Sequence, residues 1–131
     1  MNVGALMRSA HAFGANFVFT VAETYRTADL NRADTSEAAA NMPYYRFADV
    51  TDFRLPEGCQ LVGVELTDEA IELPSFHHPR AAAYVLGSER VGLTPDMIDL
   101  CDHVVKIPTR FSLNLALCGA LVMYDRTLSM G

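Results

Sequence analysis

The 131-residue chain predicts an α/β fold with a mostly parallel sheet. Short segments that are apolar on both faces alternate with helical segments, which is typical of strands buried between two layers of helices. The glycine-containing connections between them are typical of loops that join strands to helices. The strands are predicted at Asn16 to Val21, Tyr44 to Phe47, Gln60 to Leu66, Ala82 to Leu86 and His103 to Ile107.

The N-terminal third predicts a helix, a strand and a long segment with little pattern. Asn2 can cap a helix that runs to Ala12, and Gly14 suits the left-handed position that ends one. Residues 23–42 are polar and rich in Ala and Thr, so we predict a loop with a short helix around Ser36 to Ala40. Residues 49–53 predict a brief helical turn.

The C-terminal part predicts two helices. Thr94 caps the first, which starts with Pro95 and ends near Cys101. Two prolines bracket residues 74–79, which predicts a loop. The last helix, Ser112 to Leu128 with Ser112 as its cap, is apolar nearly all round. Such a helix is buried on more than one side, and in a chain this small that predicts a second subunit, in a homodimer built on this helix and on the helix from Asn2 to Phe13.

Length, charge and cysteine content limit the function. The length predicts a single domain over residues 1–131. The net charge of -6 disfavours nucleic-acid binding through a general basic surface, and we expect no DNA partner. Nine of the ten basic residues are Arg, which suits a local phosphate site. The three cysteines have no CxxC spacing, so we predict reduced core thiols in a cytoplasmic protein, without signal peptide or membrane helix.

Three clusters carry the chemical information. The first is Asn2-x-Gly4-x-x-x-Arg8, continuing to Phe13-Gly14. The second is the loop from Gly87 to Leu93, GSERVGL, between a strand and a helix, where α/β proteins bind ligands. The third is Ile107-Pro108 followed by Ser112-Leu113-Asn114-Leu115-Ala116. Each alone also fits a simpler structure: a capped helix with an exposed Arg, a tight turn, and a strand exit with a helix cap.

Together and in this order, the clusters resemble the three motifs of the SpoU family of RNA ribose 2′-O-methyltransferases, within the SPOUT superfamily. The segments NVGALMRSAHAFG, YVLGSERVGLTPDMIDLCDHVVKIP and SLNLALCGALVMYD carry the resemblance. It implies a C-terminal deep trefoil knot, a homodimer, S-adenosylmethionine as methyl donor and tRNA or rRNA as substrate. It places the cofactor at Gly87, Ile107 and Leu113. It implies catalysis by Arg8, with Asn2, Glu89, Ser112 and Asn114 as its polar neighbours.

The chemistry of methyl transfer fits these residue types. The sulfonium loses its positive charge as the methyl group leaves, so a dry apolar pocket favours the step. Arg stays protonated in proteins, and we therefore expect Arg8 to hold a phosphate or to stabilise the developing alkoxide. Glu89 is expected to orient Arg8.

Two features depart from the family pattern. Family members have a strand that leads into the motif of Asn2, and it lies inside the sheet; here the chain starts at Met1, so this first strand is expected to be missing. Only Thr109, Arg110 and Phe111 separate Pro108 from Ser112, where many members have a longer loop with glycine. Both departures bear on activity more than on ancestry.

No metal site is predicted. His77 and His78 are adjacent in an extended loop and point to opposite sides, which disfavours a shared metal. His11 and His103 are interpreted as structural, and Asp96, Asp99 and Asp102 as a solvated helix face. Three alternatives to an RNA methyltransferase stay open: a binding or scaffold protein with this fold, a methyltransferase for a small molecule or protein, and an ordinary doubly wound nucleotide-binding domain. The absence of a phosphate loop disfavours the last.

Overall fold

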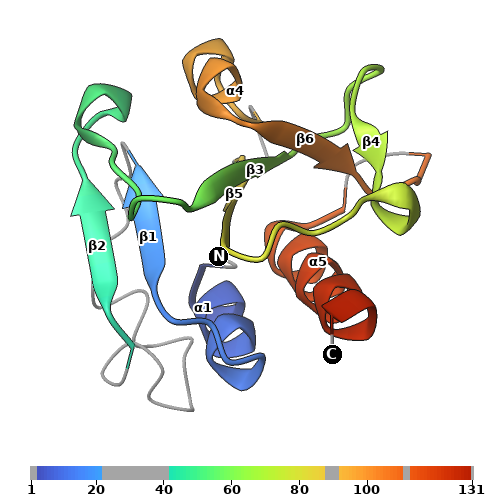
Figure 1. Cartoon of the computed structure of the whole chain (residues 1–131), viewed down its shortest axis with the longest axis horizontal. Helices are drawn as coiled ribbons and strands as arrows, with labels where there is room; N and C mark the ends of the chain where they lie inside the picture. Colours follow the sequence, from blue (N-terminus) through green and yellow to red (C-terminus); the bar gives the residue numbers. More distant parts are fainter. Residues whose placement is uncertain (1–2, 22–41, 88–91, 111–112, 131) are drawn as a thin grey trace. The chain divides into compact units, whose positions relative to one another are not determined.

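The computed structural model describes residues 3–21, 42–87, 92–110 and 113–130 (Figure 1). The chain divides into two compact units, Met1–Phe53 and Arg54–Gly131, and each is described by itself. No described helix is long and apolar enough to cross a membrane.

The first unit contains a helix and a two-stranded parallel sheet. Helix α1 covers Val3–Ala12, and Gly14 follows it with a φ of 80°, as the sequence predicts. Strand β1 (Val18–Val21) pairs with β2 (Tyr44–Phe47) in parallel. The predicted helical turn is a short 3-10 helix, Val50–Asp52, which begins at the side-chain cap of Asp49.

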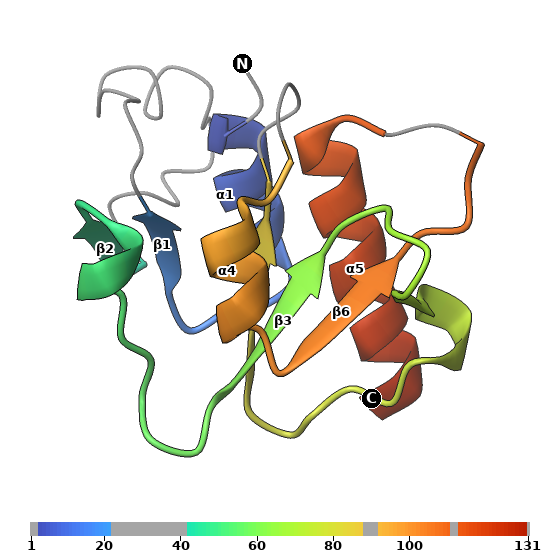
Figure 2. The same ribbon diagram turned by 90° about the horizontal axis from the view of Figure 1, so that it is seen from above.

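The second unit is built on a four-stranded parallel sheet in the order β4-β6-β3-β5. Figure 2 shows β3 and β6 running in the same direction, and β5 pairs with β3 in parallel. Strand β3 is central and its last four residues are buried. The bounds are Gln60–Val64 for β3, Ile71–Glu72 for β4, Ala82–Leu86 for β5 and His103–Lys106 for β6.

Two helices cover this sheet, one on each face (Figure 1). Helix α4 is Pro95–Leu100, and the Thr94 side chain accepts from the backbone N–H of Met97, which confirms the predicted cap. Helix α5 is Leu115–Met130. The core lies between α5 and the sheet, where fully buried side chains come from both layers: Val62, Val105 and Val122.

Within the described residues, the strand and helix predictions are confirmed in type, with four corrections. The short helix predicted around Ser36 to Ala40 lies outside the described residues and stays a prediction. The strand pairs are all parallel among the described residues, but they form two sheets. Strand β4 and the 3-10 turn Leu73–Ser75 were not predicted; the turn occupies the start of the predicted 74–79 loop. Helix α5 starts at Leu115, because the Asn114 side chain accepts from the N–H of Leu117 and takes the capping role predicted for Ser112. Asp102 is not simply solvated, since it binds the backbone of β3.

Candidate functional site

The carboxyl ends of β3, β5 and β6 meet at one edge of the sheet, which we call the carboxyl edge. In the register, Val64 of β3 lies between Leu86 of β5 and Val105 of β6. The next residue, Glu65, continues the ladder by donating its N–H to the carbonyl of Val105 at 3.0 Å. Gly87 therefore leaves the sheet on one side of Glu65, and the β6 chain leaves on the other. This edge of a parallel sheet is where α/β proteins bind ligands.

Gly87 begins the glycine loop, residues 87–93, of which Gly87, Gly92 and Leu93 are described. A Cβ on Gly87 would stand 2.6 Å from the Cα of Gly92, and closer still to the carbonyl carbon of Gly92 and the nitrogen of Leu93. Real Cβ atoms are not found so close to backbone, so the two ends of the loop pack directly against each other. Gly92 has a φ of 77°, a conformation that disfavours residues with a side chain. Both glycines are thus required by geometry.

Glu65 holds this loop and was missed by the sequence analysis, which treated it as part of a strand. Its Oε2 accepts from the backbone N–H of Leu93 at 2.6 Å, and its Oε1 accepts from the N–H of Leu66 at 3.2 Å. The signal available in the sequence was a carboxylate at the end of the otherwise apolar run QLVGVEL. A carboxylate that accepts from backbone amides forms stronger hydrogen bonds than a neutral acceptor does.

The other predicted site residues of this unit lie after β6 and at the start of α5. Ile107 is partly buried and packs against the core cluster below α5. Leu113 is partly buried, and its carbonyl accepts from the thiol of Cys118 at 3.6 Å. Asn114 is exposed and caps α5, at a distance of 2.8 Å from its Oδ1 to the Leu117 nitrogen. The sheet register brings Gly87 and Ile107 to the same edge.

An open hollow of about 570 Å³ lies where β6 ends. Two of the residues that line it, Lys106 and Arg110, bring positive charge to it, and Glu72 brings negative charge. The remaining lining residues are Leu66, Pro108 and Thr109. The hollow shares Leu66 with the neighbourhood of Glu65, so it adjoins the carboxyl edge.

Arg8 belongs to α1, in the first unit. It is exposed, whereas the residues that α1 buries are Val3, Gly4, Met7 and Ala10. Gly4 precedes Arg8 by one helical turn, as the sequence predicts. Asn2, Glu89 and Ser112 lie outside the described residues, so their predicted roles beside Arg8 stay predictions.

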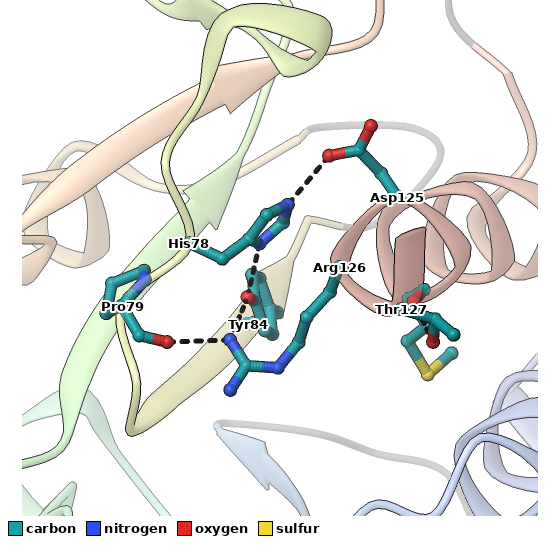
Figure 3. A network of polar contacts seen from close by, with 7 residues as sticks. His78, Pro79, Tyr84, Asp125, Arg126 and Thr127 are labelled. Atoms are coloured by element: carbon teal, nitrogen blue, oxygen red, sulfur yellow. Dashed lines mark hydrogen bonds and ion pairs between the residues drawn. The ribbon is translucent and has the colours of Figure 1, made fainter. Parts of the chain in front are cut away.

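A second polar cluster, not foreseen from the sequence, ties α5 to the segment before β5 (Figure 3). The His78 side chain is fully buried, with Nδ1 2.7 Å from the Tyr84 hydroxyl and Nε2 2.7 Å from a carboxylate oxygen of Asp125. Arg126 donates to the carbonyl of Pro79 at 2.7 Å and to the Tyr84 hydroxyl at 3.0 Å. Burial raises the pKa of Tyr84 above its usual range. The two ring nitrogens of His78 contact Tyr84 of β5 and Asp125 of α5, so the cluster links this helix to the sheet.

The cysteines are free, and all three are partly buried. Burial raises the pKa of Cys101 to about 11, and burial also raises the pKa of Cys59. Thiols with raised pKa values are poor nucleophiles at neutral pH. Among the described residues, no three His, Cys, Asp or Glu side chains gather as metal ligands would.

A four-stranded parallel sheet with helices on both faces defines an α/β protein. The particular family follows from sequence: the chain belongs to the SpoU rRNA Methylase family, whose profile matches residues 1–124.

Two curated relatives illustrate the sequence similarity. The tRNA (guanosine(18)-2′-O)-methyltransferase of Escherichia coli K12 is 26% identical over 129 residues, which cover 95% of this chain and 56% of that protein. The 23S rRNA (guanosine-2′-O-)-methyltransferase RlmB of Neisseria meningitidis is 30% identical over 133 residues, covering 95% of this chain and 52% of that protein. The chain thus spans about half the length of these curated relatives.

Solved structures share the fold. The AdoMet-bound rRNA methyltransferase of Sinorhizobium meliloti has a TM-score of 0.87 at 23% identity, over 98% of this chain and 52% of that one. The SpoU methyltransferase AviRb of Streptomyces viridochromogenes, in complex with AdoMet, has a TM-score of 0.82 at 25% identity, over 99% of this chain and 54% of that one. The family assignment and the α/β fold therefore agree.

Proposed function

We propose that this chain transfers a methyl group from S-adenosylmethionine to a ribose 2′-hydroxyl of tRNA or rRNA. The observation that carries the proposal is the crowded backbone at Gly87, placed at the carboxyl edge of a parallel sheet in a SpoU-family chain. The names of the relatives, which act on tRNA and on 23S rRNA, support the substrate class.

The residues predicted to bind the cofactor fit an adenosine. The place of a Gly87 side chain is filled by the backbone of Gly92 and Leu93, so this part of the carboxyl edge offers backbone groups to the adenine. Ile107 and Leu113 are apolar and partly buried, and they bring further backbone groups without adding charge. When bound, S-adenosylmethionine supplies an activated methyl group, which leaves as the sulfonium becomes a neutral thioether. A pocket with apolar walls favours that loss of charge.

Arg8 is proposed to act on the nucleophile. The ribose hydroxyl is a weak acid, and its oxygen gains negative charge as the C–O bond forms and the proton leaves. A guanidinium stays charged, so Arg8 stabilises that oxygen or holds the adjacent phosphate instead of accepting the proton. We propose Asn2, Glu89, Ser112 and Asn114 as its polar neighbours in the active site.

A homodimer is proposed through α5. Large apolar residues on this helix are exposed at intervals of four, three and four positions, so they share one face. Their exposed fractions are 44% for Leu117, 36% for Leu121, 53% for Tyr124 and 67% for Leu128. A continuous apolar stripe on a helix is typical of a surface that another protein covers.

The dimer is tested by light scattering. Leu121→Asp should give folded monomers at micromolar concentration, because a carboxylate buried in an apolar interface is costly. Ser129→Asp, on the same helix but off the stripe, should leave the dimer intact. A wild-type chain that is folded and monomeric at this concentration would contradict the proposal.

The C-terminal deep trefoil knot and the single-domain organisation belong to the same proposal. One family profile spans both compact units, which supports their acting as one methyltransferase domain over residues 1–131. An RNA substrate is consistent with action in the cytoplasm, which we include in the proposal.

The experiment is methyl transfer from labelled S-adenosylmethionine into bulk tRNA and rRNA, followed by alkaline hydrolysis. A 2′-O-methyl group protects the adjacent phosphodiester, so the label should appear in alkali-resistant dinucleotides. No cofactor binding in calorimetry would favour a scaffold protein instead. The chain could instead bind the cofactor but neither methylate nor bind tRNA or rRNA at any of several salt concentrations. That result would favour a substrate other than RNA.

A further inference from the structure

Glu65 joins two separate segments at the carboxyl edge through one carboxylate. Its Oε2 accepts from the N–H of Leu93, at the end of the glycine loop, and its Oε1 accepts from the N–H of Leu66, where the chain leaves β3. The first of these bonds is short, at 2.6 Å, and spans 28 residues of sequence. The carboxylate therefore fixes the end of the glycine loop to the end of the central strand.

The contact continues from Glu65 to Gly87 through Gly92. A Cβ on Gly92 would collide with the Glu65 carboxylate, whose Cδ would be 3.1 Å away. On its other side, the backbone of Gly92 packs against Gly87, where any Cβ would be too close to it. Glu65, Gly92 and Gly87 thus form a continuous row across the carboxyl edge, and the position of each sets that of the next.

We propose that Glu65 is a positioning residue for the cofactor: it holds Gly92 and Leu93 against Gly87, in the arrangement that accepts the adenosine of S-adenosylmethionine. The inference rests on the proposed function. Without the carboxylate, the N–H of Leu93 would bind water and the loop would populate other conformations. Apparent affinity falls in proportion to the fraction of molecules with a competent loop.

Asp102 provides a matched control. It too is a carboxylate that accepts from a backbone N–H of a distant segment, that of Leu61, at 2.8 Å and 41 residues away. This bond lies at the amino end of β3, whereas Glu65 lies at the carboxyl end. Loss of either bond should lower stability to a similar degree. Only loss of the Glu65 bond should change how the chain binds its cofactor.

The experiment is calorimetric titration of the 131-residue chain with S-adenosylmethionine, together with thermal unfolding, for the wild type, Glu65→Ala, Glu65→Gln and Asp102→Ala. Glu65→Ala should weaken binding about tenfold or more, the size expected for a lost hydrogen bond to a charged group. Glu65→Gln keeps an acceptor for Leu93 and should recover most of that loss. Asp102→Ala should bind within about twofold of the wild type, although its unfolding temperature falls similarly.

Two further measurements separate positioning from general destabilisation. In steady-state assays, Glu65→Ala should raise the KM for S-adenosylmethionine while kcat changes little, because the carboxylate is already occupied by backbone amides. In hydrogen exchange without cofactor, the amide of Leu93 should lose protection in Glu65→Ala and keep it in Asp102→Ala.

The positioning role is overturned if Glu65→Ala binds the cofactor like the wild type, or if Asp102→Ala weakens binding equally. If Glu65→Ala does not fold, Glu65→Ser takes its place, because its side chain is too short to reach the N–H of Leu93. Weaker binding with lost Leu93 protection supports the role, and wild-type affinity overturns it. A wild-type chain that binds no S-adenosylmethionine overturns the proposed function and the cofactor part of this inference. Hydrogen exchange then still shows whether Glu65 holds the loop.

Discussion

The two ends of strand β3 are held by the same kind of bond, yet they differ in what surrounds it. At the amino end, Asp102 accepts from the N–H of Leu61 and links the start of β6 to the start of β3. At the carboxyl end, Glu65 accepts from Leu93 and links β3 to a loop that has backbone packed on backbone. The first bond joins two strands of the sheet, and the second shapes a surface beyond the sheet.

The two ends of β3 are therefore expected to contribute differently to the stability of the fold and to the binding of the cofactor. At the amino end of β3, the bond from Leu61 to Asp102 joins two neighbouring strands of the sheet. At the carboxyl end, the backbone of Gly92 and Leu93 leaves no room for a Cβ at Gly87, so only glycine fits at this position. Substitutions at the two ends should therefore divide into those that lower stability and those that also abolish cofactor binding.

The largest expected effect is that of Gly87→Val. Its side chain would overlap the backbone of Gly92 and Leu93, so the loop must move and the adenosine site is lost. We expect the affinity for S-adenosylmethionine, measured by calorimetry, to fall by about 100-fold or more. This factor corresponds to a few kcal/mol of steric strain.

Gly58→Ala is the control at the amino end. Gly58 precedes β3 with a φ of 84° and has no atom within 4 Å of an added Cβ. The left-handed conformation should cost about 1 kcal/mol of unfolding free energy, with unchanged cofactor affinity. Equal cofactor affinity in the Gly87 variant and the wild type would mean that the site lies elsewhere.

Substitutions of Arg8 are expected to change the rate of methyl transfer without changing the affinity for the cofactor. Arg8→Ala should lower the rate of methyl transfer on the order of 100-fold, by analogy with the removal of an oxyanion donor, with nearly unchanged affinity for S-adenosylmethionine. Arg8→Lys keeps the charge but loses the two-pronged geometry, so its rate should fall only partly. If the wild-type chain is active and Arg8→Ala keeps its full rate, Arg8 has no part in the mechanism.

A smaller effect is expected at the amino end in alkaline solution. The pKa of Cys101 is raised from 9.0 to about 11 by burial, so the folded state keeps the thiol proton more tightly than the unfolded state does. The stability this provides is complete below pH 9 and is lost as the pH rises to 11. Urea midpoints should fall over that range, and less so in Cys101→Ala. An identical alkaline loss in that variant would assign the effect to Tyr84, whose pKa is also raised.

Local signals in the sequence predicted most elements of this fold. The Thr94-Pro95 pair predicted the start of α4, and Gly14 predicted the end of α1, because caps depend on neighbouring residues. Strand β4 was not predicted, since a two-residue exposed strand at the sheet edge has no apolar pattern and is defined only by pairing with β6.

The polar anchors were the part that sequence could not reveal. Glu65 meets Leu93 across 28 residues, Asp102 meets Leu61 across 41, and His78 meets Asp125 across 47. In the sequence, Glu65 looks like the end of a strand, Asp102 like a solvated residue and His78 like a loop residue. The partner of each is set by how the sheet assembles. The motif resemblance predicted Gly87 and Ile107 as site residues. The structure adds Glu65, whose side chain binds the backbone at the same edge of the sheet.

S-adenosylmethionine is expected to bind at the carboxyl edge of the four-stranded sheet. The most direct test is a titration of the ¹⁵N-labelled chain with the cofactor, followed in amide proton–nitrogen NMR spectra. The amides of Gly87, Leu93 and Ile107 should shift, while those of Leu61 and Asp102, at the opposite end of the sheet, should stay in place. Shifts that gather at the amino end, or no shifts at millimolar cofactor, would contradict the account.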